Sequence, residues 1–148
     1  MMKQEKMDQY FMRVAQLTAE LSYAKRKKVG AILVKDNRII SIGYNGTPKG
    51  WVSNECEDML PDGSLVTKPY VVHAEANALF WCAKTEIITN GSTMYLTLSP
   101  CATCALGLIQ SGIVRVVYLE TYRDLIGVEV LKKAGIQVEQ LQLSPSLS

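Results

Sequence analysis

Two short motifs, far apart in the chain, carry the side chains that most constrain the fold. The only histidine, His73, stands two residues before Glu75 in the run Val-His-Ala-Glu-Ala. Further along, Cys101 and Cys104 lie in the run Ser-Pro-Cys-Ala-Thr-Cys. One imidazole and two thiols are a sufficient protein ligand set for a catalytic zinc ion whose fourth position stays open to water. If they bind one ion, the fold must bring the two motifs together.

Both motifs are predicted to lie at the start of a helix. Residues 73–84 are rich in helix formers, so His73 and Glu75 are expected in a first helical turn. A proline followed by Cys101 and Cys104, three residues apart, fits a second helix start with both thiols on one face. Helix N-termini carry partial positive charge, which favours thiolates and an anionic glutamate. We therefore expect two helix starts to converge on one metal ion.

The same residues have the chemistry that deamination of a nucleobase requires. A His-x-Glu followed by Pro-Cys-x-x-Cys is the known signature of the zinc nucleobase deaminases. Zinc with three protein ligands lowers the pKa of its bound water to about 7, which makes a hydroxide nucleophile available. Glu75 would carry protons from that water to the ring and to the leaving amine. We predict one catalytic Zn²⁺ held by His73, Cys101 and Cys104, with Glu75 as the proton shuttle.

The two motifs also have other interpretations. A Cys-x-x-Cys pair can be a redox pair, and a structural zinc site normally has four protein ligands. A zinc-stabilised binding module without activity is a third interpretation. Glu75 argues against such a module, because a structural site has no use for a proton shuttle. The presence of both motifs in the right order favours the deaminase site.

Length and composition indicate the class of protein. The 148 residues predict a single domain over residues 1–148, and 48% hydrophobic with 20% charged residues is typical of a soluble globular chain. A net charge of +2 is too small to indicate a nucleic-acid surface. No apolar run approaches the ~18 residues of a membrane span, and the N-terminus lacks a signal-peptide core. With two of the four cysteines in the metal motif, we expect a reducing, cytoplasmic location.

The spacing of apolar residues predicts an α/β fold. Asp8 is expected to cap a helix that runs to about residue 25. Apolar runs at 29–34 and 39–44, separated by a turn, predict an antiparallel hairpin. Helices and strands then alternate, which predicts a five-stranded mixed sheet with helices on both faces. The expected helices are 73–84, 101–110 and about 124–133, and the expected strands are 93–98, 114–119 and 136–140.

Two segments show no periodic pattern. Residues 45–72 are predicted to form a long irregular loop, and a substrate-covering or regulatory role is favoured over a mobile surface excursion. This loop leads directly into His73. The C-terminal residues 141–148 are predicted to be a disordered tail.

The sequence resembles the deoxycytidylate (dCMP) deaminases of the cytidine/deoxycytidylate deaminase superfamily. The resemblance runs from about residue 8 to about 140 and is carried by Val-Gly-Ala-Ile-Leu-Val (29–34), Gly-Tyr-Asn-Gly-Thr-Pro (43–48), His-Ala-Glu-Ala-Asn-Ala (73–78) and Tyr-Leu-Thr-Leu-Ser-Pro-Cys (95–101). Cytidine, guanine and tRNA adenosine deaminases share the metal motif, so this motif alone does not identify the substrate. The 43–48 segment is the part of the resemblance that favours the dCMP deaminases. The resemblance implies a cytidine-deaminase-like three-layer α/β/α fold. It also implies hydrolysis of dCMP to dUMP and ammonia, which would supply dUMP for dTMP synthesis.

By position, the resemblance also implies contacts to the nucleoside. Asn45 would hydrogen-bond the deoxyribose, although an asparagine beside Gly46 is also a common turn residue. The backbone N–H of Ala74 would hold the pyrimidine carbonyl. A backbone carbonyl near Ser99 would accept a hydrogen bond from the exocyclic amine.

The 5′-phosphate requires cationic or hydroxyl partners. Arg26 precedes the first strand and aligns with a basic position in similar bacterial sequences. Tyr122 and Arg123 follow a strand, at the edge where open α/β sheets usually bind ligands. The basic run 25–28 can instead be a solvated helix end.

The same zinc site is also compatible with other deaminase substrates. A tRNA or other nucleic-acid base deaminase, or a free cytidine deaminase, would use the same zinc site. The nucleic-acid alternative requires a basic surface lined with aromatic residues, whereas charges nearly cancel and aromatic residues are 7%. The resemblance implies a homo-oligomer, a hexamer in many relatives, with dCTP and dTTP as possible regulators. A second, structural zinc is expected to be absent or weak, because there is no other histidine and Cys56 has no obvious partners.

Overall fold

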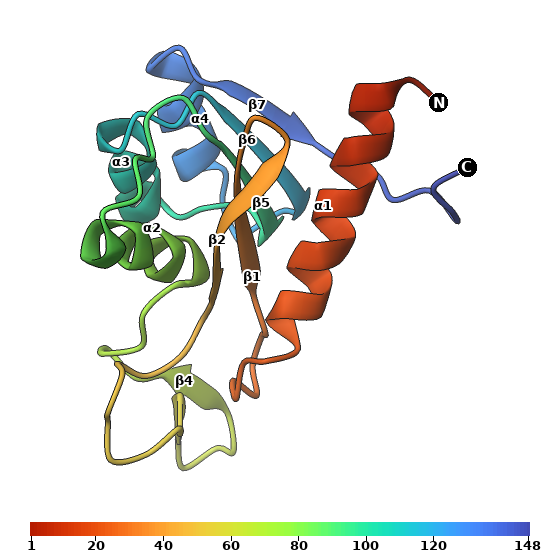
Figure 1. Cartoon of the computed structure of the whole chain (residues 1–148). Coiled ribbons are helices and arrows are strands. Elements are labelled where there is room, and N and C mark those ends of the chain that lie inside the picture. The colour runs from red at the N-terminus through yellow and green to blue at the C-terminus, as the bar shows by residue number, and fades with distance from the viewer.

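A central sheet of five strands organises the chain, and the computed structural model describes residues 1–148 (Figure 1). Its strands are β1 (Gly30–Lys35), β2 (Arg38–Tyr44), β5 (Thr93–Leu98), β6 (Arg115–Glu120) and β7 (Gln137–Gln140). They lie side by side in the order β2-β1-β5-β6-β7. The helices are α1 (Lys3–Ala19), α2 (Ala74–Thr85), α3 (Ala102–Gln110) and α4 (Ile126–Lys133).

The strand directions confirm the predicted mixed sheet. Strand β1 is antiparallel to both β2 and β5, whereas β5, β6 and β7 run parallel to one another. The first two strands form the expected hairpin. At its turn, Asp36 and Asn37 both adopt positive φ angles (51° and 58°), which suits a tight hairpin connection.

Helices cover both faces of the sheet, which confirms the predicted three layers (Figure 1). Helix α1 packs on one face, where Phe11 and Met12 share an apolar cluster with Ile32. Helices α2, α3 and α4 cover the other face, and Leu33 belongs to the cluster beneath them. Because successive side chains of a strand point to opposite faces, the adjacent Ile32 and Leu33 serve different layers. No helix is long and apolar enough to cross a membrane.

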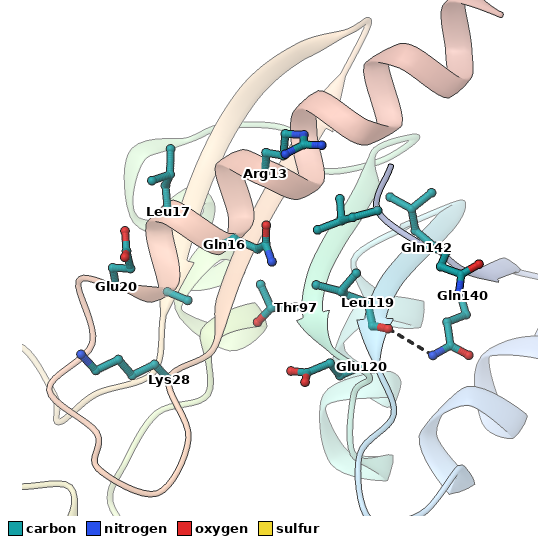
Figure 2. Close-up of a pocket in the computed structure, with 13 residues that line it drawn as sticks. Arg13, Gln16, Leu17, Glu20, Lys28, Thr97, Leu119, Glu120, Gln140 and Gln142 are labelled. Atoms are coloured by element: carbon teal, nitrogen blue, oxygen red, sulfur yellow. Dashed lines mark hydrogen bonds between the residues drawn. The ribbon is translucent and has the colours of Figure 1, made fainter. Parts of the chain in front are cut away.

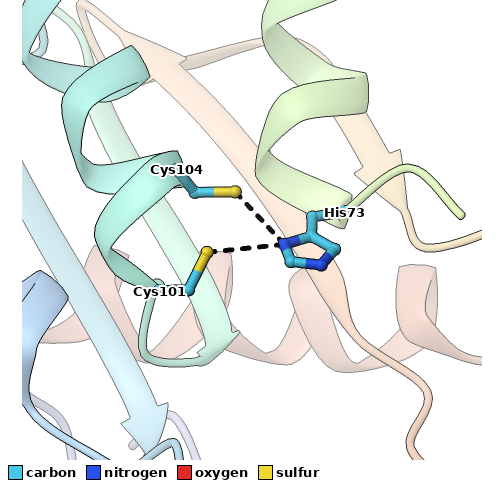
Figure 3. Close-up of side chains that lie close together, drawn as sticks. All are labelled: His73, Cys101 and Cys104. Atoms are coloured by element: carbon cyan, nitrogen blue, oxygen red, sulfur yellow. Dashed lines mark hydrogen bonds between the residues drawn. The ribbon is translucent and has the colours of Figure 1, made fainter. Parts of the chain in front are cut away.

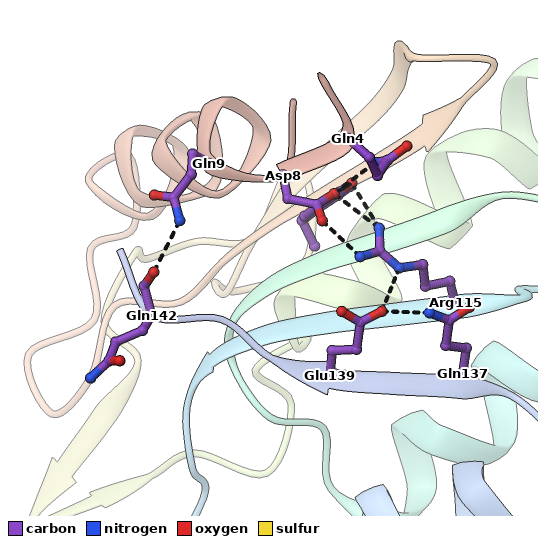
Figure 4. Close-up of polar contacts among 8 residues, drawn as sticks. Gln4, Asp8, Gln9, Arg115, Gln137, Glu139 and Gln142 are labelled. Atoms are coloured by element: carbon purple, nitrogen blue, oxygen red, sulfur yellow. Dashed lines mark hydrogen bonds and ion pairs between the residues drawn. The ribbon is translucent and has the colours of Figure 1, made fainter. Parts of the chain in front are cut away.

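Helix α1 corrects the prediction at both ends, since it spans Lys3–Ala19 and not Asp8 to about residue 25. Asp8 is not a cap but a buried residue of the helix interior. Its carboxylate accepts hydrogen bonds from Arg115 (2.7 and 2.9 Å; Figure 4) and from the Tyr95 hydroxyl (2.5 Å). Arg115 also donates to Glu139 of β7 (2.9 Å). Arg115 and Tyr95 are distant from Asp8 in the sequence. The local pattern, which predicts a helix start at Asp8, contains no information about them.

The segment 45–72 is not wholly irregular, which corrects a second prediction. It contains a small antiparallel hairpin formed by β3 (Glu57–Met59) and β4 (Leu65–Thr67). Strands of three residues are too short to produce a visible alternation in the sequence. Across the same segment, the rings of Trp51 and Tyr70 stack with centroids 4.9 Å apart.

The C-terminal segment also differs from the disordered tail predicted for residues 141–148. Leu141 and Leu143 pack against the apolar cluster beneath α1. The side-chain amide of Gln9 donates to the carbonyl of Gln142 (2.9 Å; Figure 4). The packing of Leu141 and Leu143 could not be predicted from their own short polar segment, because helix α1, against which the segment lies, is at the other end of the chain.

The two motifs lie where α2 and α3 begin. His73 and Cys101 immediately precede these helices and occupy their N-cap positions. The side chain of Asn77 in α2 donates to the carbonyl of Tyr44 (2.8 Å), which attaches the start of α2 to the end of β2. The remaining helix and strand boundaries lie within two residues of the predicted ones.

Candidate metal centre and active-site cavity

Three metal-ligating side chains from the two motifs meet in the structure (Figure 3). Nδ1 of His73 lies 3.3 Å from Sγ of Cys104 and 3.7 Å from Sγ of Cys101. All three ligand atoms lie within 4.8 Å of one another. The predicted convergence of the two helix starts is therefore confirmed.

The spacing of these atoms fits a tetrahedral zinc ion. With Zn–N near 2.0 Å and Zn–S near 2.3 Å, a nitrogen and a sulfur bound to one tetrahedral zinc are about 3.6 Å apart. The two nitrogen–sulfur distances here, 3.3 and 3.7 Å, bracket that value. His73 and Cys101 also line a cavity, so the fourth position of an ion faces open space. Three protein ligands with an open fourth position are typical of a catalytic site.

The charge state of the two thiols also suits a cation. Contact with the Cys104 thiol, and then with His73, lowers the pKa of Cys101 to about 3. The Cys101 thiol and burial raise the pKa of Cys104. Two thiolates this close repel each other unless a positive charge lies between them. A metal ion bound between them would supply that charge and would displace the remaining proton.

Glu75 lies beside the ligands, in the first turn of α2, without belonging to the ligand set. The residue is only 4% exposed, and it lines the same cavity. Burial raises the pKa of Glu75 to about 7. A carboxyl group with a pKa near the working pH can both accept and donate a proton, so this position suits the predicted shuttle.

Two glycines let neighbouring elements pack directly on the turns that hold the ligands. A Cβ on Gly43 of β2 would lie 2.1 Å from the carbonyl oxygen of Ala74, next to His73. A Cβ on Gly127 of α4 would lie 2.1 Å from the carbonyl oxygen of Pro100. Neither role was predicted, although a glycine within a strand pattern is a known sign of close backbone approach.

The ligands open onto a cavity of about 770 Å³, within the range of roughly 300–1,000 Å³ that is usual for small-molecule sites. The structure brings the predicted site residues together around it, except Cys104, which does not line the cavity. Those that line it are Arg26, Asn45, His73, Ala74, Glu75, Ser99, Cys101, Tyr122 and Arg123.

Asn45 has a structural task as well as a place at the cavity. Its Oδ1 accepts from the backbone N–H of Val29 (2.9 Å), and its Nδ2 donates to the carbonyl of Lys27 (2.9 Å). A side-chain amide has two donor hydrogens and two acceptor sites, so one of each remains available. These partners lie 16 and 18 residues away, so the side chain joins distant segments and forms no local turn bond, and it keeps hydrogen-bonding capacity for a ligand.

Ser99 connects the metal-bearing turn to the residues expected to bind phosphate. Its hydroxyl accepts from the backbone N–H of Tyr122 (2.7 Å), and its own N–H donates to the carbonyl of Glu120 (2.8 Å). The guanidinium of Arg123 lies 5.2 Å from the centroid of the Tyr122 ring. Hydrogen bonds to Ser99 therefore hold this segment against the cavity.

The sequence matches a known family of proteins. A family model, the cytidine and deoxycytidylate deaminase zinc-binding region, matches residues 5–120. The chain belongs to this deaminase family. The resemblance drawn from the sequence motifs is confirmed, and the match includes both metal motifs.

Individual relatives match nearly the whole chain. ComE operon protein 2 of Bacillus subtilis is 39% identical over 140 residues, which cover 92% of this chain and 71% of that protein. The deoxycytidylate deaminase of Saccharomyces cerevisiae is 36% identical over 144 residues, or 93% of this chain. The chain spans only 45% of the length of that yeast enzyme.

A solved structure shares the fold over its full length. The dCMP deaminase of cyanophage S-TIM5, crystallised with dCMP and dUMP, is 41% identical with a TM-score of 0.86. The match covers 95% of this chain and 99% of that one. The predicted cytidine-deaminase-like fold is therefore confirmed.

Several residues of the deaminase cavity were not predicted from the sequence. Glu57 and Thr67 line it from the β3–β4 hairpin. Lys27 and Glu120 line it as an ion pair (2.6 Å). Apart from Lys27, which belongs to the basic run 25–28, no local pattern marks these residues, because they reach the cavity through contacts between distant segments.

A second, larger hollow of about 1240 Å³ lies between α1 and the C-terminal segment (Figure 2). Arg13, Gln16 and Lys28 line it, together with Gln140 and Gln142. None of the metal ligands and none of the predicted substrate contacts reaches it. The chemistry of this deaminase is therefore assigned to the smaller cavity.

Proposed function

We propose that this chain catalyses the zinc-dependent hydrolytic deamination of dCMP to dUMP and ammonia. One observation carries the proposal: the cavity lined by Glu75 and by two of the metal ligands, His73 and Cys101, is also lined by two arginines, Arg26 and Arg123. A deaminase of free nucleosides has no use for cations that would bind a phosphate. Support also comes from the similar cyanophage dCMP deaminase, which was crystallised with dCMP and dUMP.

The residues of the site divide the chemistry among them. His73, Cys101 and Cys104 would hold the zinc ion, which would supply a hydroxide nucleophile at neutral pH. Glu75 takes one proton from the attacking water and transfers it to ring N3; it then takes the proton of the new C4 hydroxyl and gives it to the amine, which leaves as ammonia when the C4–N bond breaks. Each transfer needs only hydrogen-bond reach, and the buried position of Glu75 keeps bulk water from competing.

Backbone groups at the two helix starts hold the base. Ala74 is the first residue of α2, where N–H groups have no acceptor within the helix. Its N–H binds the pyrimidine carbonyl, and a carbonyl near Ser99 accepts from the exocyclic amine. The free hydrogen-bonding positions of Asn45 bind the deoxyribose. The phosphate lies against Arg26, Tyr122 and Arg123.

Other properties expected from the sequence remain part of this proposal. They are one zinc ion per chain, assembly as a homo-oligomer such as a hexamer, regulation by dCTP or dTTP, and a cytoplasmic location without membrane or nucleic-acid partners. A second metal is not proposed. Cys56 is buried, and its thiol donates to the carbonyl of Asn54 (3.5 Å).

A substrate comparison tests the proposal. The purified, zinc-loaded chain is incubated separately with dCMP, deoxycytidine and a tRNA, and the loss of cytosine absorbance or the formation of inosine is followed. We expect dCMP to have the highest kcat/KM. A preference for deoxycytidine would contradict the phosphate assignment, and turnover of tRNA alone would contradict the substrate class.

A further inference from the structure

Glu57, the first residue of β3, is a buried carboxylate without a basic side chain as its partner. It is 9% exposed, and it takes part in none of the ion pairs of the chain. Its two oxygens accept from the backbone N–H of Lys25 (3.0 and 3.2 Å), and one also accepts from the backbone N–H of Arg26 (3.0 Å). Successive backbone N–H groups make a concave site for an anion. Here the anion is a side chain of the protein itself.

The same hairpin also holds the other end of Arg26. Its guanidinium Nη1 donates to the Thr67 hydroxyl of β4 (3.1 Å). Glu57 and Thr67 are direct cross-strand partners in the β3–β4 pair. Glu57 of β3 therefore binds the backbone of Arg26, and Thr67, the facing residue of β4, binds its side chain.

Charge distinguishes Arg26 from most of the other cations near the cavity. Lys27 is paired with Glu120 and Lys68 with Asp58. Arg26 has no carboxylate partner, so its charge is available to a ligand. The Thr67 hydroxyl accepts from Arg26 and can still donate its own hydrogen.

We propose that Glu57 is a positioning residue for phosphate recognition, which holds the 25–26 backbone so that Arg26, with Thr67, meets the 5′-phosphate of the nucleotide. The inference rests on the proposed function, because it requires a phosphate-bearing substrate in this cavity. A carboxylate would by itself repel a phosphate. Both Glu57 oxygens accept hydrogen bonds from the backbone N–H groups of Lys25 and Arg26, which offset part of its negative charge.

The variant Glu57→Gln tests this role, because it keeps the shape of the side chain but turns an N–H₂ group toward a backbone donor. We expect the KM for dCMP to rise by roughly tenfold with kcat nearly unchanged, a size typical of losing charge-assisted hydrogen bonds. Deoxycytidine, which has no phosphate, should keep its KM. Binding of dUMP and of deoxyuridine, measured by calorimetry, gives the same comparison without turnover.

Three further variants make the test specific. Glu55→Gln makes the same chemical change at an exposed site two residues away and should behave as the unmodified chain. Thr67→Val removes the hydroxyl contact at nearly constant volume and should weaken dCMP binding selectively. In an Arg26→Met background, Glu57→Gln should add no further loss, because Glu57 acts through Arg26.

The outcomes separate this inference from the proposed function. If the unmodified chain does not prefer dCMP over deoxycytidine, or dUMP over deoxyuridine, both are overturned. If that preference exists and Arg26→Met removes it, but Glu57→Gln and Thr67→Val keep it, only the positioning role is wrong. Equal losses for phosphorylated and unphosphorylated ligands, or an additive loss with Arg26→Met, would reduce Glu57 to a purely structural residue.

Discussion

Replacement of Gly43 or Gly127 by alanine should damage the metal centre although neither residue touches a ligand atom. Each added methyl group would lie 2.1 Å from a backbone carbonyl oxygen, that of Ala74 or of Pro100, in a turn that carries a metal ligand. Real Cβ atoms are not found closer than 3.0 Å to such atoms, so one element must move by roughly 0.9 Å.

The size of that movement sets the expected effect. Ligand distances in metal sites tolerate changes of only about 0.2 Å, so a movement of this size disturbs the site. We expect zinc affinity to fall by roughly 10–100-fold in both variants, as for changes that misorient ligands from outside the ligand set. Gly43→Ala also displaces the turn that carries Glu75, so kcat at saturating zinc should fall by about 100-fold. Overpacking should cost about 1–3 kcal/mol of stability in either variant.

The assay is competition for zinc with a chromophoric chelator, together with kcat for dCMP at saturating zinc. Gly46→Ala is the matched control, because a Cβ at Gly46 meets no atom within 4 Å. If Gly43→Ala and Gly127→Ala bound zinc as tightly as the control and kept full turnover, the argument that close packing orients the ligands would be refuted.

Two predictions concern stability. Burial raises the pKa of Asp8, but hydrogen bonds from Arg115 and other donors outweigh it and hold the pKa below the ordinary 3.8. The stabilisation is therefore present above about pH 4 and is lost as the pH falls below it. Asp8→Asn should cost about 3 kcal/mol at pH 7, or roughly 6–12 °C in Tm, and the difference should shrink at pH 3; an equal Tm at pH 7 would contradict the prediction. Deletion of residues 141–148 should cost about 2 kcal/mol in urea unfolding through the loss of Leu141 and Leu143, and an unchanged stability would mean that their packing contributes nothing.

The parts of the fold that could be predicted from sequence are those with a local cause. The hairpin, the alternating helices and strands, and the two helix starts follow from periodicity and from residues such as the proline before Cys101. The metal centre was predicted because the chemistry of zinc restricts its ligands to few residue types. His73, Cys101 and Cys104 could therefore be recognised as a set without knowledge of their distances.

The parts that could not be predicted have causes distant in the sequence. Asp8 resembles a helix cap until Arg115 is placed against it, and Leu141 resembles a tail residue until the cluster under α1 is known. Glu57 sits in a strand of three residues, which is too short for an alternating pattern, and its backbone partners lie before β1. The hydrogen bonds of Asn45 to Val29 and Lys27 also join segments distant in the sequence, so its own neighbours did not indicate them.

The most direct test of the account is the zinc content and dCMP turnover of Glu75→Gln, measured on the same preparations as the unmodified chain and His73→Ala. The account predicts one zinc per chain in Glu75→Gln with turnover reduced by about 10²–10⁴-fold, and loss of bound zinc in His73→Ala. Unchanged turnover in Glu75→Gln, or full zinc content in His73→Ala, would contradict a metal centre served by a separate proton shuttle.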